Sequence, residues 1–144
     1  MAFHKTSPGY MTNLAARLFA RAVDESIRDL GVSAGYLPVF FVLCGGRSMS
    51  QTALAKSVAI EQPTMAATLA RMERDGLIQR RPDPDDGRST LVSLAPAAEK
   101  KVKAIEKAVG KVNQRALSGL SEREKLAFVT SLETIVRALS GGEQ

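Results

Sequence analysis

The order of local patterns in residues 48–94 restricts the fold of this chain more than any other feature. Two short amphipathic helical patterns are followed by an apolar strand, a turn-rich segment and a second strand, which cover Gln51–Val58, Gln62–Asp75, Leu77–Arg80, Pro82–Ser89 and Thr90–Leu94. Two helices and then a hairpin in this order predict a helix-turn-helix followed by a β-hairpin wing.

Local signals set the ends of these two helices and their buried side. Ser50 is a typical N-cap for the first helix, and Pro63 has the fixed φ that suits the first turn of the second. Met65, Leu69 and Met72 recur at spacings of four and three residues, which predicts that they share the buried face.

Helical patterns also occur before this module. A broad apolar stripe predicts a long helix over Tyr10–Leu30. A second helix is expected after Ser33, whose hydroxyl can cap it, with Pro38 in its first turn. Residues 39–43 are apolar on every side, so this helix should lie in the centre of the core.

Two more helices are expected after Pro96. The first, some twenty residues long, has a narrow heptad seam formed by Val102, Ile105, Val109, Val112 and Ala116. The second begins at a capping box, Ser121 to Glu124. Its apolar face is formed by Leu126, Val129, Leu132, Val136 and Leu139.

These patterns predict a mainly α fold with a small β-hairpin wing. We expect residues 1–144 to form one domain, in which a winged helix-turn-helix over 33–94 is flanked by dimerisation helices over 1–31 and 96–140. A homodimer is expected, because a module of about 50 residues offers little surface to cover amphipathic helices from both ends. The alternative is a monomer in which these helices pack on their own module.

Composition excludes several classes of function. One cysteine, Cys44, allows no internal disulfide, and one histidine, His4, leaves no set of residues to hold zinc. We expect Cys44 to be a small core side chain, with redox sensing as the less favoured alternative. No nucleophile with a partner base and no phosphate-binding glycine loop is present, so we expect no enzyme and no cofactor. No 18-residue apolar run occurs, which favours a cytoplasmic protein.

The net charge of +5 favours a polyanionic partner, but its distribution is uneven. Residues 47–94 carry seven basic and six acidic side chains, so the candidate DNA-binding module is nearly neutral. Binding to double-stranded DNA would therefore depend on individual, correctly placed side chains.

A helix in the major groove needs short or polar side chains in its first turns. Those of the second helix are Gln62, Pro63, Thr64, Ala66 and Ala67. Gln62 can pair with an adenine edge and Thr64 can bond a base or a phosphate, whereas the alanines could simply be helix formers on a solvated face.

Further contacts are expected around this helix. Arg71 and Arg74 would reach phosphates, and Ser50, Gln51 and Thr52 offer polar groups at the start of the preceding helix. Each of the five could instead be an ordinary surface residue.

In the wing, we expect Asp83 and Asp85 to form the turn and the carboxylate of Asp86 to hold the guanidinium of Arg88 in one orientation. A fixed arginine at the wing tip can enter a narrow A·T minor groove. The alternative is a solvated hairpin tip without a partner.

Several motifs in order resemble the MarR family of bacterial winged-helix regulators. They are Met49–Ala55, Glu61–Met65, Met72–Ile78, Asp83–Arg88 and Leu91–Leu94. The resemblance implies a homodimer that binds a pseudo-palindromic operator, usually as a repressor in a stress response, and is released by a small phenolic or other anionic ligand or by thiol oxidation. Ala67 and Gly87 stand where relatives are often basic, which implies fewer charged contacts.

The resemblance also places an effector pocket between the first two helices, where Arg17, Arg21 and Tyr36 offer polar groups beside apolar walls. A sequence-specific, dimeric regulator that binds duplex DNA is therefore the leading hypothesis. A winged-helix module that docks a protein partner is the alternative, and a small-molecule enzyme is a distant third.

Overall fold

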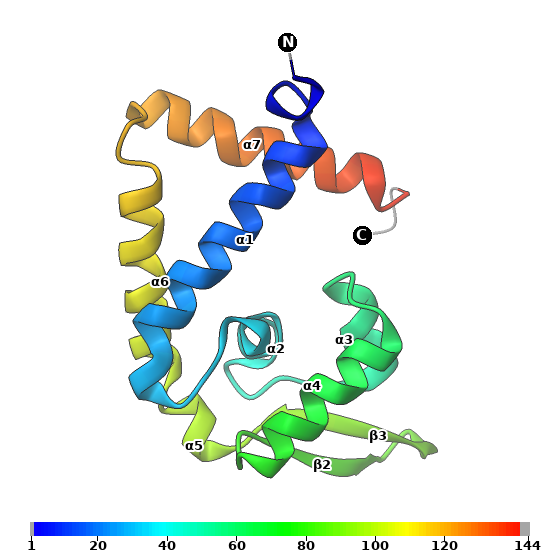
Figure 1. Cartoon of the computed structure of the whole chain (residues 1–144). Helices are drawn as coiled ribbons and strands as arrows, with labels where there is room; N and C mark the ends of the chain where they lie inside the picture. Colours follow the sequence, from blue (N-terminus) through cyan, green and yellow to red (C-terminus); the bar gives the residue numbers. More distant parts are fainter. Residues whose placement is uncertain (1, 142–144) are drawn as a thin grey trace. The chain divides into compact units, whose positions relative to one another are not determined.

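The computed structural model describes residues 2–141, which form helices and one small antiparallel sheet (Figure 1). The helices are α1 (Pro8–Ile27), α2 (Leu37–Leu43), α3 (Gln51–Ser57), α4 (Gln62–Arg74), α5 (Pro96–Glu99), α6 (Val102–Ala116) and α7 (Glu122–Leu139). The strands are β1 (Ser48–Ser50), β2 (Ile78–Asp83) and β3 (Asp86–Leu94), and single 3₁₀ turns are η1 (Phe3–Lys5), η2 (Arg28–Leu30) and η3 (Ala34–Tyr36). The predicted fold class is confirmed.

The chain divides into two compact units, Met1–Val109 and Gly110–Gln144. The first contains the helix-turn-helix and the wing, and the second contains the end of α6 and all of α7. Over residues 2–141 no single helix has both the length and the apolar character needed to cross a bilayer; only Pro8–Leu30 and Ala34–Leu43 taken together, across a bend of 93°, meet that criterion.

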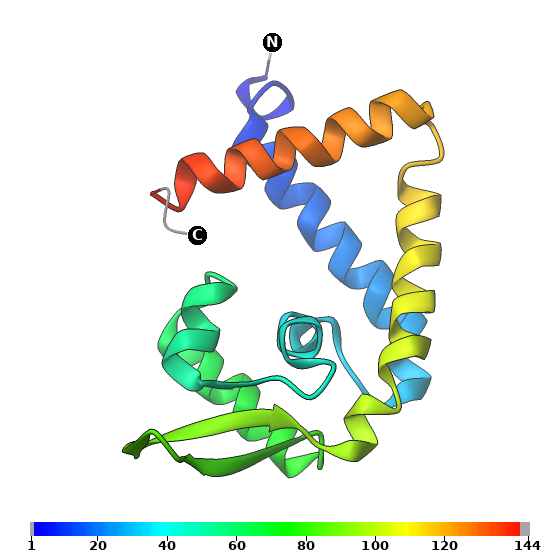
Figure 2. The ribbon, with the colours of Figure 1, turned by 180° about the vertical axis from the view of Figure 1, so that it is seen from behind.

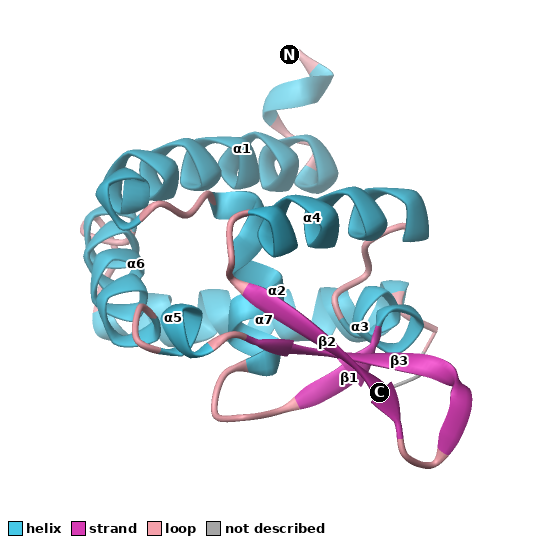
Figure 3. Cartoon of the chain, turned by 90° about the horizontal axis from the view of Figure 1, so that it is seen from below, coloured by secondary structure: helices cyan, strands magenta, loops and turns pink. Residues whose placement is uncertain are grey.

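The sheet has the order β1-β3-β2, with both pairs antiparallel (Figure 3). β3 contacts α2 and α3, while β2 contacts α4, so the inner face of the sheet packs on the helix-turn-helix. β1 was not predicted from the sequence. The three residues of β1 pair with β3 far along the chain, Ser48 opposite Ser93, and a pairing of this kind leaves no periodic pattern in so short a segment.

The core of the first unit lies where α1, α2, α3, α4 and the sheet meet. Met65, Leu69 and Met72 are fully buried, as predicted, together with Phe40 from α2 and Ile27 from α1. Pro38 lies in the first turn of α2, also as predicted.

Two expectations about α2 were wrong. Phe41 is 38 % exposed, because a helix at the edge of a small core turns one side outward. Ser33 makes no side-chain cap; the backbone N–H of Ala34 donates instead to Oδ1 of Asp24, at 2.5 Å, from the neighbouring α1. A carboxylate supplied by tertiary packing thus replaces the local hydroxyl cap.

The wing differs from the prediction. Residues 82–89 were expected to be a loop, but β2 and β3 continue through most of them, as two long strands joined by a short turn (Figure 2). Only Pro84 and Asp85 separate the strands. Oδ1 of Asp83 accepts the backbone N–H of Asp85 at 2.9 Å, which confirms its expected role in the turn. Cross-strand pairing extends the hairpin past most of the turn-forming residues, so their local preference does not end the strands.

The predicted twenty-residue helix after Pro96 is also interrupted, at Lys100 and Lys101, between α5 and α6. Both sides of this break are anchored to other elements of the first unit. The carboxylate of Glu99 accepts the backbone N–H groups of Gly45 and Gly46 at 3.2 and 3.1 Å, and Nζ of Lys101 donates to the backbone oxygen of Leu30. These contacts interrupt the helix, although its apolar periodicity continues through the break.

In the second unit, α7 begins at the predicted capping box. The Ser121 hydroxyl accepts the backbone N–H of Glu124, and the Glu124 carboxylate accepts the backbone N–H of Ser121. These hydrogen bonds, the one from the backbone of Ser121 first, lower the pKa of Glu124. Much of the predicted apolar face of α7 is exposed, including Leu126, Val129, Val136 and Leu139.

Candidate nucleic-acid interface

One side of α4 is buried and the other is open to solvent. The buried side consists of Met65, Thr68, Leu69 and Met72. All of the residues predicted to face DNA from this helix are exposed, namely Gln62, Pro63, Thr64, Ala66, Ala67, Arg71 and Arg74. Because the large apolar residues of α4 lie on its buried side, the exposed side presents short and polar side chains at the start of the helix. The cations Arg71 and Arg74 follow them.

The start of α3 lies beside the start of α4. The hydroxyl of Ser50 accepts the backbone N–H of Ala53 at 3.1 Å, which confirms it as the N-cap of α3. Nε2 of Gln51 donates to Oε1 of Gln62 at 3.4 Å, so two of the predicted DNA-facing residues contact each other. Thr52 is exposed next to them.

The cations at the far end of α4 have acidic neighbours. Nε of Arg74 lies 3.5 Å from Oδ1 of Asp75, and Nε of Arg80 on β2 lies 3.1 Å from Oε2 of Glu73. Surface pairs of this kind contribute little to stability, but they hold the guanidinium groups near the helix. Arg71 is exposed on the same helix.

At the wing, the structure corrects the expected contact between Asp86 and Arg88. Oδ1 of Asp86 accepts the backbone N–H of Arg88 at 3.0 Å, and the described residues include no ion pair between the carboxylate and the guanidinium. Asp86 therefore shapes the backbone at the start of β3. Arg88 is exposed near the hairpin turn, and its guanidinium forms no ion pair with any acidic side chain of residues 2–141.

Two arginines on β2 were not among the predicted contacts. Arg80 lies next to Glu73 of α4, whereas Nη2 of Arg81 donates to Oγ of Ser48 on β1 at 3.1 Å. Consecutive residues of a strand point to opposite faces, so these two cations serve different surfaces. The signal that could have identified them is the Arg-Arg pair at the end of an apolar strand.

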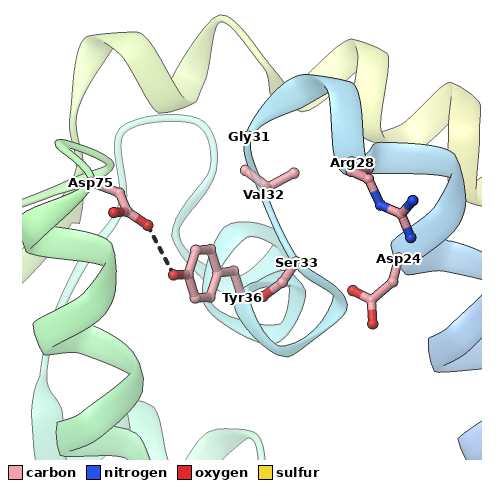
Figure 4. A pocket seen from close by; sticks show the side chains of 7 residues that line it. All are labelled: Asp24, Arg28, Gly31, Val32, Ser33, Tyr36 and Asp75. Carbon is pink, nitrogen blue, oxygen red and sulfur yellow. Dashed lines mark hydrogen bonds between the residues drawn. The ribbon is translucent and has the colours of Figure 1, made fainter.

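A cavity of about 460 Å³ lies near the end of α4 (Figure 4). Its lining is Asp24, Arg28, Gly31, Val32, Ser33, Tyr36 and Asp75. Tyr36 thus lies where an effector pocket was expected, but Arg17 and Arg21 are exposed on α1 and do not line it. Apart from Tyr36, the polar side chains that line the cavity are therefore not the predicted ones.

The hydroxyl of Tyr36 donates to Oδ2 of Asp75 at 3.0 Å, which connects η3 to the C-cap of α4 (Figure 4). Burial, this hydrogen bond and the charge of Asp75 raise the pKa of Tyr36, against the opposing effect of Arg71 and Arg74. The phenol therefore stays protonated and keeps its role as a donor.

The remaining candidates take no part in these sites. Cys44 is half-buried after α2, with its thiol 3.5 Å from the backbone oxygen of Phe41, and the ring of His4 packs on that of Tyr10. Within residues 2–141, no group of three or more histidine, cysteine or acidic side chains could hold a metal ion.

The first unit matches a known family. A sequence model of the MarR family matches residues 46–90, which span β1, the helix-turn-helix and most of the wing. An uncharacterized HTH-type transcriptional regulator of Bacillus subtilis (strain 168), YwoH, is 30 % identical over 119 residues, which are 83 % of this chain and 86 % of YwoH.

Solved structures agree. A probable transcriptional regulator from Pseudomonas aeruginosa is 28 % identical, with a TM-score of 0.80 over 90 % of this chain and 96 % of its own. A putative MarR family regulator from Listeria monocytogenes, solved in complex with a 26mer DNA, has a TM-score of 0.85 at 16 % identity and covers 94 % of this chain and 90 % of its own. The second likeness concerns the fold alone.

Proposed function

Because the chain belongs to the MarR family of transcriptional regulators, we propose that it binds a pseudo-palindromic operator in duplex DNA as a homodimer. In this proposal α4 enters the major groove and the β2–β3 wing follows the adjacent minor groove. The family consists of regulators and not enzymes, so the prediction that this chain is not an enzyme is confirmed. A duplex DNA partner would place the protein in the compartment that holds the genome, which in a bacterial cell is the cytoplasm.

The exposed side of α4 is the observation that carries the proposal. Gln62 and Thr64 can bond base edges, Ala66, Ala67 and Pro63 can contact a thymine methyl group, and Arg71 and Arg74 can reach phosphates. A surface made for a protein partner would be expected to contain large apolar anchors, and the exposed side of α4 has none.

The experiment is a fluorescence-anisotropy titration with the DNA upstream of the protein's own gene, repeated in excess nonspecific DNA. Specific binding at least about a thousandfold tighter than nonspecific binding would support the proposal. If neither this DNA nor sequences selected from a random pool are bound specifically, the alternative of a protein-interaction module is favoured.

We also propose that the protein acts as a repressor and that the cavity beside Tyr36 admits a small phenolic or anionic effector. Arg28 provides a cation at one side of the cavity, and the Tyr36–Asp75 hydrogen bond leads from it to the end of α4. A ligand that bonds Tyr36 in place of Asp75 would change how this end of α4 is held.

The effector proposal is tested by adding salicylate, as a phenolic anion, to the protein–operator complex. Release of DNA by the wild type, and weaker release from Arg28→Ala, is the expected result. Equal release from both proteins would argue against this cavity as the site.

A further inference from the structure

The first residues of α3 and α4 are joined by their side chains. Gln51 is the first residue of α3 and Gln62 the first of α4, and Nε2 of Gln51 donates to Oε1 of Gln62 at 3.4 Å. Both lie on the surface proposed for DNA, and Gln62 is exposed. The contact is therefore not a product of core packing. The amide of Gln62 remains accessible to a base.

The backbone on both sides of this pair is well held. Ser50 caps α3, and the turn between the helices is closed by a hydrogen bond of 3.0 Å from the backbone N–H of Ile60 to the oxygen of Ala55. Leu54 of α3 and Met65 of α4, on the inner sides of the two helices, are completely buried. With the two Cα positions set in this way, the remaining freedom is that of the side-chain torsions.

A glutamine amide has one oxygen with two acceptor positions and one nitrogen with two donors. In the arrangement observed, the bond from Gln51 occupies one acceptor position of Gln62 and places the oxygen end of that amide next to Gln51. The second acceptor position and both donors stay available. Adenine needs this combination, because N6 donates and N7 accepts side by side in the major groove, whereas guanine presents two acceptors there.

We propose that Gln51 is a specificity-determining residue that holds the amide of Gln62 in the orientation for reading adenine. The inference rests on the proposed function, since it requires α4 to lie in the major groove. Ordering a free glutamine side chain costs conformational entropy, so a partner that orders it before binding also raises affinity.

The test measures base preference rather than overall affinity. Operators carrying each of the four bases at every position are titrated with the wild type, Gln51→Ala, Gln51→Glu and Gln62→Ala. At one position in each half-site, Gln62→Ala should remove an adenine preference of roughly 5- to 150-fold. Gln51→Ala should lower the same preference at least about threefold, as expected for coupled neighbours.

Among these variants, Gln51→Glu gives the most discriminating measurement. A glutamate only accepts, so Gln62 must turn its NH₂ group toward it, and its oxygen and nitrogen exchange places. The adenine preference should fall further than in Gln51→Ala, at the same position. Gln114→Ala, an exposed glutamine on α6, is the matched control and should keep the wild-type preference.

In the free protein, the side-chain amide signals of Gln51 in a ¹⁵N correlation spectrum should shift in Gln62→Ala and not in Gln114→Ala. If the variants of Gln51 bind the operator with the wild-type preference at every position, the proposed role of Gln51 is wrong and the proposed function is unaffected. A wild type without any specific DNA binding would reject this role together with the proposed function, so the two failures are distinguishable.

Discussion

At the scale of single residues, the exposed side chains at the start of α4 are short or polar and carry no charge. Residues 47–94 are nearly neutral as a whole, so affinity for DNA has to come from a few guanidinium groups in suitable positions. Those of Arg71 and Arg74 lie on α4, and that of Arg88 lies near the turn of the wing. Asp86 bonds the backbone of Arg88, and within residues 2–141 no acidic side chain forms an ion pair with its guanidinium, which can therefore reach a minor groove.

Arg88→Ala should therefore weaken operator binding by roughly 1 to 3 kcal/mol and lower the slope of log affinity against log salt by about one. The loss of one contact to the polyanion is the physical reason. Anisotropy titrations between 50 and 200 mM salt, about the range in which such contacts are lost, measure both values. Arg115→Ala, an exposed arginine at the end of α6, is the control. An unchanged slope for Arg88→Ala would exclude the wing from the interface.

Tyr36→Phe removes the hydrogen bond to Asp75 and should lower the free energy of unfolding by about 1 kcal/mol at neutral pH. The folded state raises the pKa of Tyr36, so the phenol favours folding fully below its ordinary pKa. That contribution is lost as the pH rises from the ordinary value toward the raised one. Urea titrations at pH 8 and above pH 10 should show a smaller alkaline loss in Tyr36→Phe. Equal pH dependence in the two proteins would contradict this.

At the scale of elements, helix starts followed the local chemistry. Ser50, Ser121 and the early prolines Pro38 and Pro63 all stand where their capping and φ preferences predicted. Failures occurred where a distant residue supplied the partner. Asp24 replaces Ser33 as a cap, and Glu99 and Lys101 interrupt a helix whose periodicity is continuous.

The junction between α4 and β2 depends on Gly76, whose φ is +73°. Gly76→Ala should lower the free energy of unfolding by about 1 to 2 kcal/mol, because a Cβ is disfavoured in this conformation. Nothing lies within 4 Å of the added carbon, so the cost is conformational and not a collision. Gly87→Ala, in β3, meets no neighbour either and has no positive φ. Chemical denaturation should find it nearly neutral, and equal losses in both variants would refute the explanation.

At the scale of the whole molecule, exposed apolar side chains remain on both terminal parts of the chain. In the second unit, Leu126 and Leu139 are 70 % and 84 % exposed, and in the first unit Leu18 and Met11 of α1 are about half exposed. Large apolar surfaces of this kind usually mark an interface, which supports the proposed homodimer. In the alternative, these residues would pack on the chain's own module.

Leu126→Asp and Val129→Asp should each weaken the dimer roughly tenfold or more, because a buried apolar side chain contributes about 1.5 to 3 kcal/mol. Sedimentation velocity over a concentration series measures this effect. Ser131→Asp, which adds the same charge on the opposite side of α7, should leave the dimer unchanged. If the wild type sediments as a monomer throughout, the proposed dimer is wrong.

The sequence by itself determined the order of the helix-turn-helix and the wing strands, the caps of α3 and α7, the buried side of α4 and the exposed residues at its start. Each of these depends on neighbours within a few turns, so periodicity and capping reveal them. Only the tertiary structure decided that β1 joins the sheet, that the wing strands continue past the aspartates, and that Gln51 meets Gln62. Ser48 of β1 pairs with Ser93 far along the chain, and the other two contacts depend on how neighbouring strands and helices pack on each other. No local propensity encodes which of several polar side chains will be brought together.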